Sequence, residues 1–177
     1  DAQGFRDTQD NPLDGNADGF GSDSFVVDFR VDASGATPLP SLQPVAPAAS
    51  LVFDAPASGH LFGTSDSDDT TVTLDAGQRA SLRVTPAAAG LQVQVQWIGP
   101  DGATVLGSAN AAAGQTVLLQ NMAAAVAGTY TVRVGSLAGS GTYETHLVLN
   151  AQIESASWGS ADNSAQSSAE SLDGSAI

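Results

Sequence analysis

The sequence predicts an all-β protein built as an antiparallel sandwich or barrel. The clearest evidence is residues 91–98, LQVQVQWI, where apolar and polar side chains alternate strictly, as they do in a strand with one buried face. Further short apolar runs follow along the chain, each bounded by Gly, Asp, Pro, Ser or Asn. Strands about 8–12 residues apart with turn residues between them are typical of sandwiches and barrels.

The first predicted element is an extra N-terminal strand at residues 25–31, within the stretch SFVVDFRV. Its odd-numbered residues are all apolar and share one face, so the strand needs a sheet to supply hydrogen bonds and to cover that face. Three places are open to it: its own sandwich, a neighbouring module, or the sheet of another copy. We expect it to pair outside residues 51–150, and pairing between copies makes a filament.

Composition divides the rest of the chain. After a first segment, residues 1–32, residues 33–50 hold four of the eight prolines and no charged residue, which predicts a semi-extended linker. Residues 51–150 contain the regularly spaced strands and form the predicted self-sufficient domain. Residues 151–177 are small and polar without alternation, which predicts a polar C-terminal tail or the lead-in to a next repeat.

The strands of the main domain are expected in the runs SLVFD, GHLFG, TVTLD, RASLRVT, LQVQVQWI, QTVLLQ, GTYTVRV and TYETHLVLN. The turn sequence GPDG at 99–102, followed by ATVLG, predicts a hairpin. Residues 121–128, NMAAAVAG, are too short for more than one helical turn. The predicted core comprises Leu82, Val84, Val93, Val95, Trp97, Val132, Val134 and Leu147.

The composition also restricts the partners. The net charge is −14, from 16 Asp, 3 Glu and 5 Arg, with no Lys and no Cys. Such a surface repels nucleic acid and anionic lipid, and no apolar run reaches the roughly 20 residues of a membrane span. We therefore expect no nucleic acid partner and no membrane insertion. Because Asp favours turns and ligates calcium, its excess points to calcium as the cofactor.

The acidic stretch DNPLDGNADGFGSD at residues 10–23 predicts a calcium site. The expected ligands are Asp14, Asn16 and Asp18, helped by Asp23, Asp10 or Asp7. The first three have the D-x-N-x-D-G spacing of an EF-hand-type loop, in which oxygens at alternate positions surround one ion. Position twelve of that loop is Phe25 in place of Glu, so another carboxylate must complete the site. The alternative is a solvated acidic turn.

A second acidic cluster, SDSDD, supplies the weaker candidates Asp66, Asp68 and Asp69. One interpretation is a polar turn between two strands. The other is a second calcium site, or a turn that shapes an edge facing a ligand.

The sequence offers little support for catalysis, and we expect no enzyme. His60 and His146 are the only histidines, both within predicted strands, and there is no nucleophile elbow, zinc-protease motif or phosphate loop. The carboxylates cluster in glycine-rich turns, whereas a catalytic acid needs burial to raise its pKa. Aromatic side chains for stacking on a sugar would have to come from Tyr130, Tyr143 or Trp158.

Residues 59–150 resemble the bacterial pre-peptidase C-terminal domain. The resemblance rests on GHLFGTSDSDDTTVTLDAGQRASLRV, VQWIGPDGATVLGSA and AGTYTVRVGSLAGSGTYETHLVLN. It implies a jelly-roll-like β-sandwich of the kind found beside secreted proteases and in tandem in large surface proteins. A secreted or cell-surface location in a bacterium is part of what it implies.

Both flanks resemble parts of further modules. Residues 1–32 resemble the last strand of a bacterial immunoglobulin-like module, in which an acidic loop precedes an alternating strand. Residues 154–177 are similar to the lead-in of another pre-peptidase-type repeat. Together with a start that is not Met, these resemblances imply a slice of a tandem-repeat protein.

We therefore expect a non-catalytic, calcium-stabilised structural or adhesive module of a secreted or cell-surface bacterial protein. Its partners would be other copies of itself or neighbouring repeats, joined by strand addition. The alternative is a carbohydrate- or peptide-binding module appended to a secreted enzyme, with a surface polysaccharide as its partner.

Overall fold

The computed structural model describes residues 6, 8, 9, 35–47 and 49–153 of the 177-residue chain. The chain divides into two compact units, Asp1–Asp32 and Ala33–Ile177, and the description below concerns the second. The predicted strand at 25–31 and the tail from residue 154 onward lie outside the described residues.

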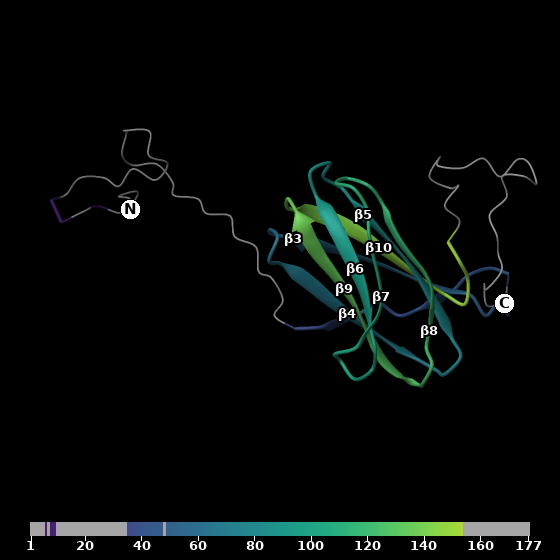
Figure 1. Ribbon diagram of the computed structural model, residues 1–177. Helices are drawn as coiled ribbons and strands as arrows, with labels where there is room; N and C mark the ends of the chain where they lie inside the picture. Colours follow the sequence, from purple (N-terminus) through teal and green to yellow (C-terminus); the bar gives the residue numbers. More distant parts are fainter. Residues whose placement is uncertain (1–5, 7, 10–34, 48, 154–177) are drawn as a thin grey trace, which may run out of the picture. The chain divides into compact units, whose positions relative to one another are not determined.

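Ten strands form in the described part of the chain (Figure 1). They are β1 (Thr37–Pro38), β2 (Gln43–Pro44), β3 (Phe53–Leu61), β4 (Ser67–Leu74), β5 (Arg79–Pro86), β6 (Gln92–Ile98), β7 (Val105–Asn110), β8 (Val117–Ala123), β9 (Gly128–Ala138) and β10 (Gly141–Leu149). Among these residues there is no helix long and apolar enough to cross a membrane.

The strands form two sheets of five strands each. The first sheet has the order β1-β4-β9-β6-β7, and the second has the order β2-β3-β10-β5-β8. Four antiparallel pairs nest inside one another: β3 with β10, β4 with β9, β5 with β8, and β6 with β7. The chain is thus one long hairpin wrapped across two sheets, which is the jelly roll. The predicted all-β, jelly-roll-like sandwich is confirmed.

The core lies between the sheets and follows the predicted alternation. In β6, Val93, Val95 and Trp97 are buried, while the glutamines between them are only half-buried. All eight core residues predicted from the sequence are at most 2% exposed. The Trp97 ring stacks on Tyr130, with ring centroids 5.3 Å apart.

The predicted hairpin at 99–104 joins β6 to β7. The Gly99 N–H donates to the Thr104 carbonyl at 2.8 Å, and Gly102 has a φ of 71°, in the left-handed region that favours glycine. Residues 121–128 form no helical turn. Their first three residues belong to β8, and Ala124 is fully buried, so packing on the core decides the conformation there.

Part of the range predicted as linker lies on the sandwich. β1 pairs with β4 in parallel at the edge of the first sheet, and β2 pairs with β3 at the edge of the second. Leu39 and Leu42 pack against the core, and the Leu39 N–H donates to the Thr71 carbonyl at 2.8 Å. Two leucines among the prolines therefore hold this segment against the domain.

The residues that follow β10 run along the end of the second sheet and reach β8, which is the edge opposite β2. Asn150 has a φ of 60°, and its N–H donates to the Arg79 carbonyl at 2.6 Å. Its side-chain amide donates to the Leu51 carbonyl at 2.9 Å. Further along, the Ile153 N–H donates to Oε1 of Gln120 in β8 at 2.8 Å. The chain thus begins the sandwich beside β4 and leaves it beside β8 (Figure 1).

Candidate functional site

The ligands predicted for the main calcium site lie outside the described residues: Asp10, Asp14, Asn16, Asp18 and Asp23. Calcium binding there stays a prediction. In the part of the chain that is described, no group of three or more His, Cys, Asp or Glu side chains is placed to hold a metal ion.

The second acidic cluster lies where β3 turns into β4. Asp66 closes the turn, and its Oδ2 accepts a hydrogen bond from the Phe62 N–H at 2.7 Å. Because β4 begins at Ser67, Asp68 and Asp69 are consecutive strand residues whose side chains point to opposite faces of the sheet. The structure does not bring the three carboxylates together, and each has a different protein partner.

Asp68 joins the two sheets. The Tyr143 hydroxyl, on β10 of the second sheet, donates to Oδ2 of Asp68 at 2.7 Å, and Tyr143 is only 4% exposed. Gly59 of β3 lies against this bond, because a Cβ at that position would be 2.3 Å from the Tyr143 hydroxyl oxygen and 2.6 Å from the carboxylate. Glycine is therefore required for the bond to form at this end of the sandwich.

Asp69 lies on the outer face of the first sheet, directly opposite Arg133 of β9. The guanidinium makes two parallel hydrogen bonds to the carboxylate, both 2.7 Å long, and the hydrogen bond to Asp69 raises the pKa of Arg133 above its usual value. The Arg133 side chain is 43% exposed, and a pair this exposed adds little stability. Its structural effect is to fix the plane of the guanidinium on the sheet.

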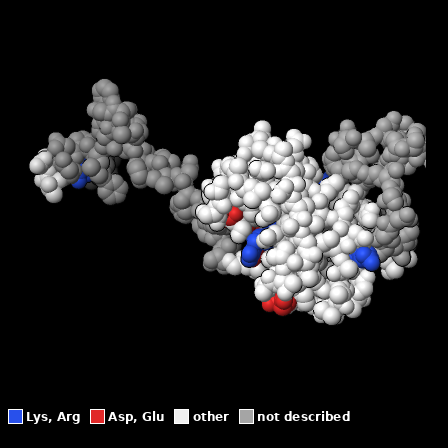
Figure 2. All heavy atoms as spheres, viewed as in Figure 1, with Lys and Arg blue, Asp and Glu red and all other residues white. Residues whose placement is uncertain are grey.

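The outer face of the first sheet is polar across four strands, and we call it the polar face. One row across β7, β6, β9 and β4 consists of Ser108, Gln96, Arg133 and Asp69, and the next row consists of Asn110, Gln94, Gly135 and Ser67. Charged side chains are few on the side of the sandwich shown in Figure 2. A neutral, hydrogen-bonding surface results.

A groove of about 250 Å³ lies on this face, between the turn at residues 64–67 and strands β6 and β9. Gly135 forms part of its lining and contributes no side chain. Gln94 and Gln96 are half-buried beside it, and neither side chain has a hydrogen-bond partner within the described part of the chain. The groove therefore presents amide donors and acceptors. Amides neither gain nor lose protons near neutral pH, so these groups suit binding better than proton transfer.

Sequence reasoning found part of this face. The alternation in β6 placed the glutamines on the polar side, opposite the core. It missed Arg133 and Gly135, whose position beside them depends on the β6–β9 register. No local pattern reports a pairing between strands so far apart in the sequence.

The histidines and tyrosines take structural positions. His146 lies in β10 with its Nδ1 2.9 Å from Oδ1 of Asp54, and the His60 ring in β3 lies 4.5 Å from that of Phe62. Tyr130 and Tyr143 are buried, so neither offers a ring face to a sugar. Trp158 lies outside the described residues.

Fold and face together define a class, a jelly-roll β-sandwich module with a polar sheet face. No protein-family profile matches the sequence, and no curated protein matches it. Solved structures do match. The pre-peptidase C-terminal domain of collagenase from Bacillus anthracis is 15% identical, with a TM-score of 0.49, over 67% of this chain and 99% of that one.

Two further structures are similar at the same low level. One is PliG of Aeromonas hydrophila, a periplasmic inhibitor of g-type lysozyme, with 16% identity and a TM-score of 0.43 over 66% of this chain and 99% of that one. The other is the carbohydrate-binding module CBM36, solved with calcium and xylotriose, with 16% identity and a TM-score of 0.32 over 52% of this chain and 85% of that one.

Proposed function

We propose that this chain is a non-catalytic structural module of a secreted or cell-surface bacterial protein, stabilised by calcium in its N-terminal segment and serving as a spacer. The main support for this proposal is the position of the two ends of the sandwich. Phe53 at the start of β3 pairs with Leu149 at the end of β10, so a jelly roll alone begins and ends at one place. Here the segments before β3 and after β10 carry the two ends to opposite edges of the sandwich.

Separated ends suit a module in a row of modules. Neighbours attached at one point would collide, whereas neighbours attached at opposite edges stand apart. The four strand spacings from β1 to β7 alone correspond to about 19 Å. The hydrogen bonds of Leu39 and Asn150 hold the ends in place, as a spacer requires.

The charged side chains of the sandwich support a structural function. Asp68 bonds to Tyr143, Asp69 to Arg133 and Asp54 to His146. Each pair joins two strands that are far apart in the sequence. These carboxylates therefore act as connections within the fold.

A pair of spin labels tests the spacer function. The chain has no cysteine, so the double variant Ala36→Cys/Gln152→Cys places one label at each end of the sandwich. We expect one narrow distance distribution of about 20 Å or more. Labels at Ser58→Cys/Glu144→Cys, which are paired neighbours, serve as the short-distance control. A broad or short distribution for the end labels would contradict the proposal.

Ligand binding at the polar face is the second candidate, and it is favoured by the side-chain amides of Gln94 and Gln96, which have no hydrogen-bond partner among the described residues. Their neutral donors and acceptors beside a fixed guanidinium match the hydroxyls of a saccharide or the backbone of an extended peptide. In a screen of bacterial surface polysaccharides, Gln94→Ala/Gln96→Ala should weaken binding at least tenfold, while Thr73→Ala on the same sheet should not. Equal binding by both variants would exclude this face.

A further inference from the structure

The two lateral sides of the sandwich differ in how they protect their sheet edges. On one side β1 and β2 cover parts of β4 and β3. The residues that oppose further pairing on this guarded side are Pro38, Pro44 and Pro56, which lack an N–H, and the charged Asp68 and Asp69 of β4. Prolines and charges at sheet edges are the usual means by which proteins prevent unwanted strand pairing.

The other side has an open edge at β7. This strand contains no proline and no charged residue, and within the described part of the chain it pairs only with β6. Val105 and Leu106 at its start are 47% and 48% exposed. An uncharged edge strand with exposed apolar residues readily accepts another strand.

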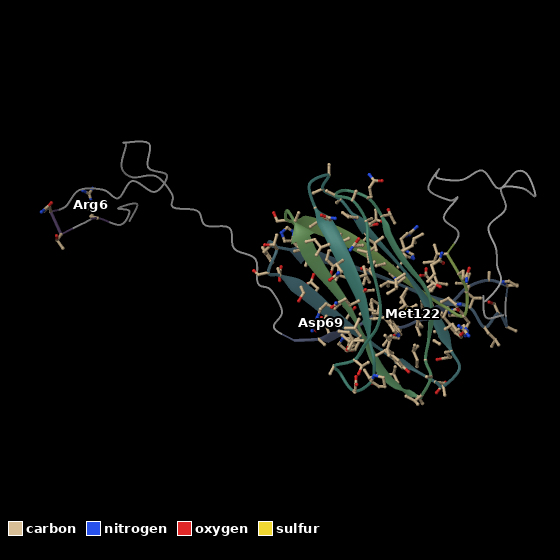
Figure 3. All side chains as sticks on the ribbon, in the orientation of Figure 1. Arg6, Asp69 and Met122 are labelled. Carbon is tan, nitrogen blue, oxygen red and sulfur yellow. The ribbon has the colours of Figure 1, made fainter. Side chains whose placement is uncertain are left out.

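The residues beside β7 determine which side-chain pattern an added strand must have. Gly107 and Ala109 are small, and a Cβ on Gly107 would lie 2.5 Å from Sδ of Met122 in β8. Met122 therefore covers the inner side of β7, and Figure 3 shows it across the sandwich from Asp69 of the guarded side. A strand added here needs apolar side chains toward β8, and polar side chains that extend the two rows ending at Ser108 and Asn110 on the polar face.

Residues 25–31 have this pattern. The apolar side chains of FVVDFRV alternate with a second set that includes Asp28 and Arg30, whose charges cancel. The segment therefore carries no net charge, and neither does β7. Electrostatic repulsion between the two strands is absent, although the whole chain has a net charge of −14.

The chain between residue 31 and Pro38 has no spare length for the segment to pair with β7 of its own chain. One row across the first sheet consists of Pro38, Thr71, Thr131, Ile98 and Val105. A strand beyond β7 would lie five spacings from Pro38, about 24 Å along the sheet. Residue 31 is seven residues from Pro38, which is at most about 25 Å when fully extended. That straight line passes through the sheet itself, and a path over its surface is longer.

We propose that β7 accepts residues 25–31 of a second copy of this chain. The donor segment precedes β1 on the guarded side and the acceptor lies on the opposite side, so each copy both donates and accepts. Such a head-to-tail contact makes an open filament. This proposal goes beyond the spacer function, because the spacer function does not require the chain to assemble.

The test measures assembly of the full chain by sedimentation and electron microscopy as the protein concentration rises. Leu106→Lys/Ser108→Lys adds two charges to the open edge at exposed positions and should raise the dissociation constant at least tenfold. Ser58→Lys/Ser67→Lys adds the same charge to exposed positions on the guarded side and should leave assembly unchanged. Circular dichroism and thermal melting verify that each variant is folded, and Ser108→Lys alone replaces the double variant if it is not.

A mixing experiment identifies the donor. A chain with Val27→Pro should lose its donor segment and keep its acceptor edge, while the edge variant keeps its donor. Mixed together, the two should form a one-to-one complex that grows no further. A wild-type chain that stays monomeric near 1 mM, or assembly that the edge variant leaves unchanged, would overturn the proposal. Neither result bears on the end-to-end distance that tests the spacer function.

Discussion

Trp97 is the largest fully buried side chain of the described sandwich, and its polar atom is unpaired. The ring stacks on Tyr130 at an interplanar angle of 17°, while its Nε1 has no hydrogen-bond partner within the described residues. The side chain therefore combines a large packing gain with the penalty of a buried donor, which is about 1–3 kcal/mol.

Two substitutions measure how much the ring at this position contributes by packing. Trp97→Ala should lower the free energy of unfolding by about 3–5 kcal/mol, because it leaves a large cavity. Trp97→Phe keeps a ring against Tyr130 and removes the unpaired N–H, so its cost should be clearly smaller, about 1–2 kcal/mol. Urea unfolding measures both values. Equal losses would mean that the phenyl ring left at this position adds no stability by packing against Tyr130.

Asp101, in the turn between β6 and β7, has a lowered pKa. The Thr104 hydroxyl, the Thr104 N–H and the Ala103 N–H all donate to its carboxylate, and they lower the pKa from 3.8 to about 2. Because the folded state binds this proton more weakly than the unfolded state, the stability that the group supplies is full above about pH 4. It is lost as the pH falls through 2.

Asp101→Asn isolates this effect. The amide oxygen still accepts hydrogen bonds in the turn but does not titrate. The difference in free energy of unfolding between wild type and variant should therefore shift in favour of the variant between pH 4 and pH 2. Urea unfolding at the two pH values measures the shift. A constant difference would show that the folded and unfolded chains bind this proton equally.

At the scale of the elements, Gly59 allows β3, β4 and β10 to meet. Gly59→Ala would place a methyl group on the hydrogen bond between Tyr143 and Asp68, and overpacking of this kind costs about 1–3 kcal/mol. The control is Gly90→Ala, where a Cβ meets nothing within 4 Å. Tyr143→Phe should relieve part of the clash, so a double-mutant cycle should show coupling between positions 59 and 143. Additive effects would mean that the tyrosine hydroxyl is not the group displaced.

Single elements could be predicted from the sequence because their signals are local. The alternation of Val93, Val95 and Trp97 with three glutamines identified β6 and its buried face, and the GPDG turn identified the following hairpin. The jelly-roll likeness came from short motifs that occur together.

Contacts between elements could not be predicted in this way. The Asp69–Arg133 pair and the close approach of Gly59 to Tyr143 depend on register between distant strands, which composition and periodicity do not contain. The Pro-rich range likewise predicts a semi-extended linker, and its composition does not indicate that Leu39 and Leu42 pack against the core.

For the whole molecule, calcium binding at residues 10–23 predicts a dependence of stability on the free ion. A ligand that binds only the native state raises the free energy of unfolding by about 3–4 kcal/mol at 100 to 1,000 times its dissociation constant. The midpoint of thermal unfolding should therefore rise between chelator and millimolar calcium. Differential scanning calorimetry of the full chain measures this.

Variants identify the site. Asp14→Asn/Asp18→Asn should abolish the calcium-dependent rise, whereas Asp66→Asn, in the turn before β4, should preserve it. Should the Asp66 variant alone lose the response, the ion would lie at the second acidic cluster instead. Identical midpoints with and without calcium in the wild-type chain would exclude the site.

The nested pairing of the strands has a consequence for how the molecule forms. Of the four nested pairs, β6 and β7 are the closest in sequence, and each further nested pair closes a longer loop around them. Contacts of such long range make folding slow. β3 must wait for β10, the last strand of the sandwich, so a chain synthesised only as far as β9 cannot complete the second sheet. Closure of the sandwich therefore comes only after the whole span from β3 to β10 has been synthesised.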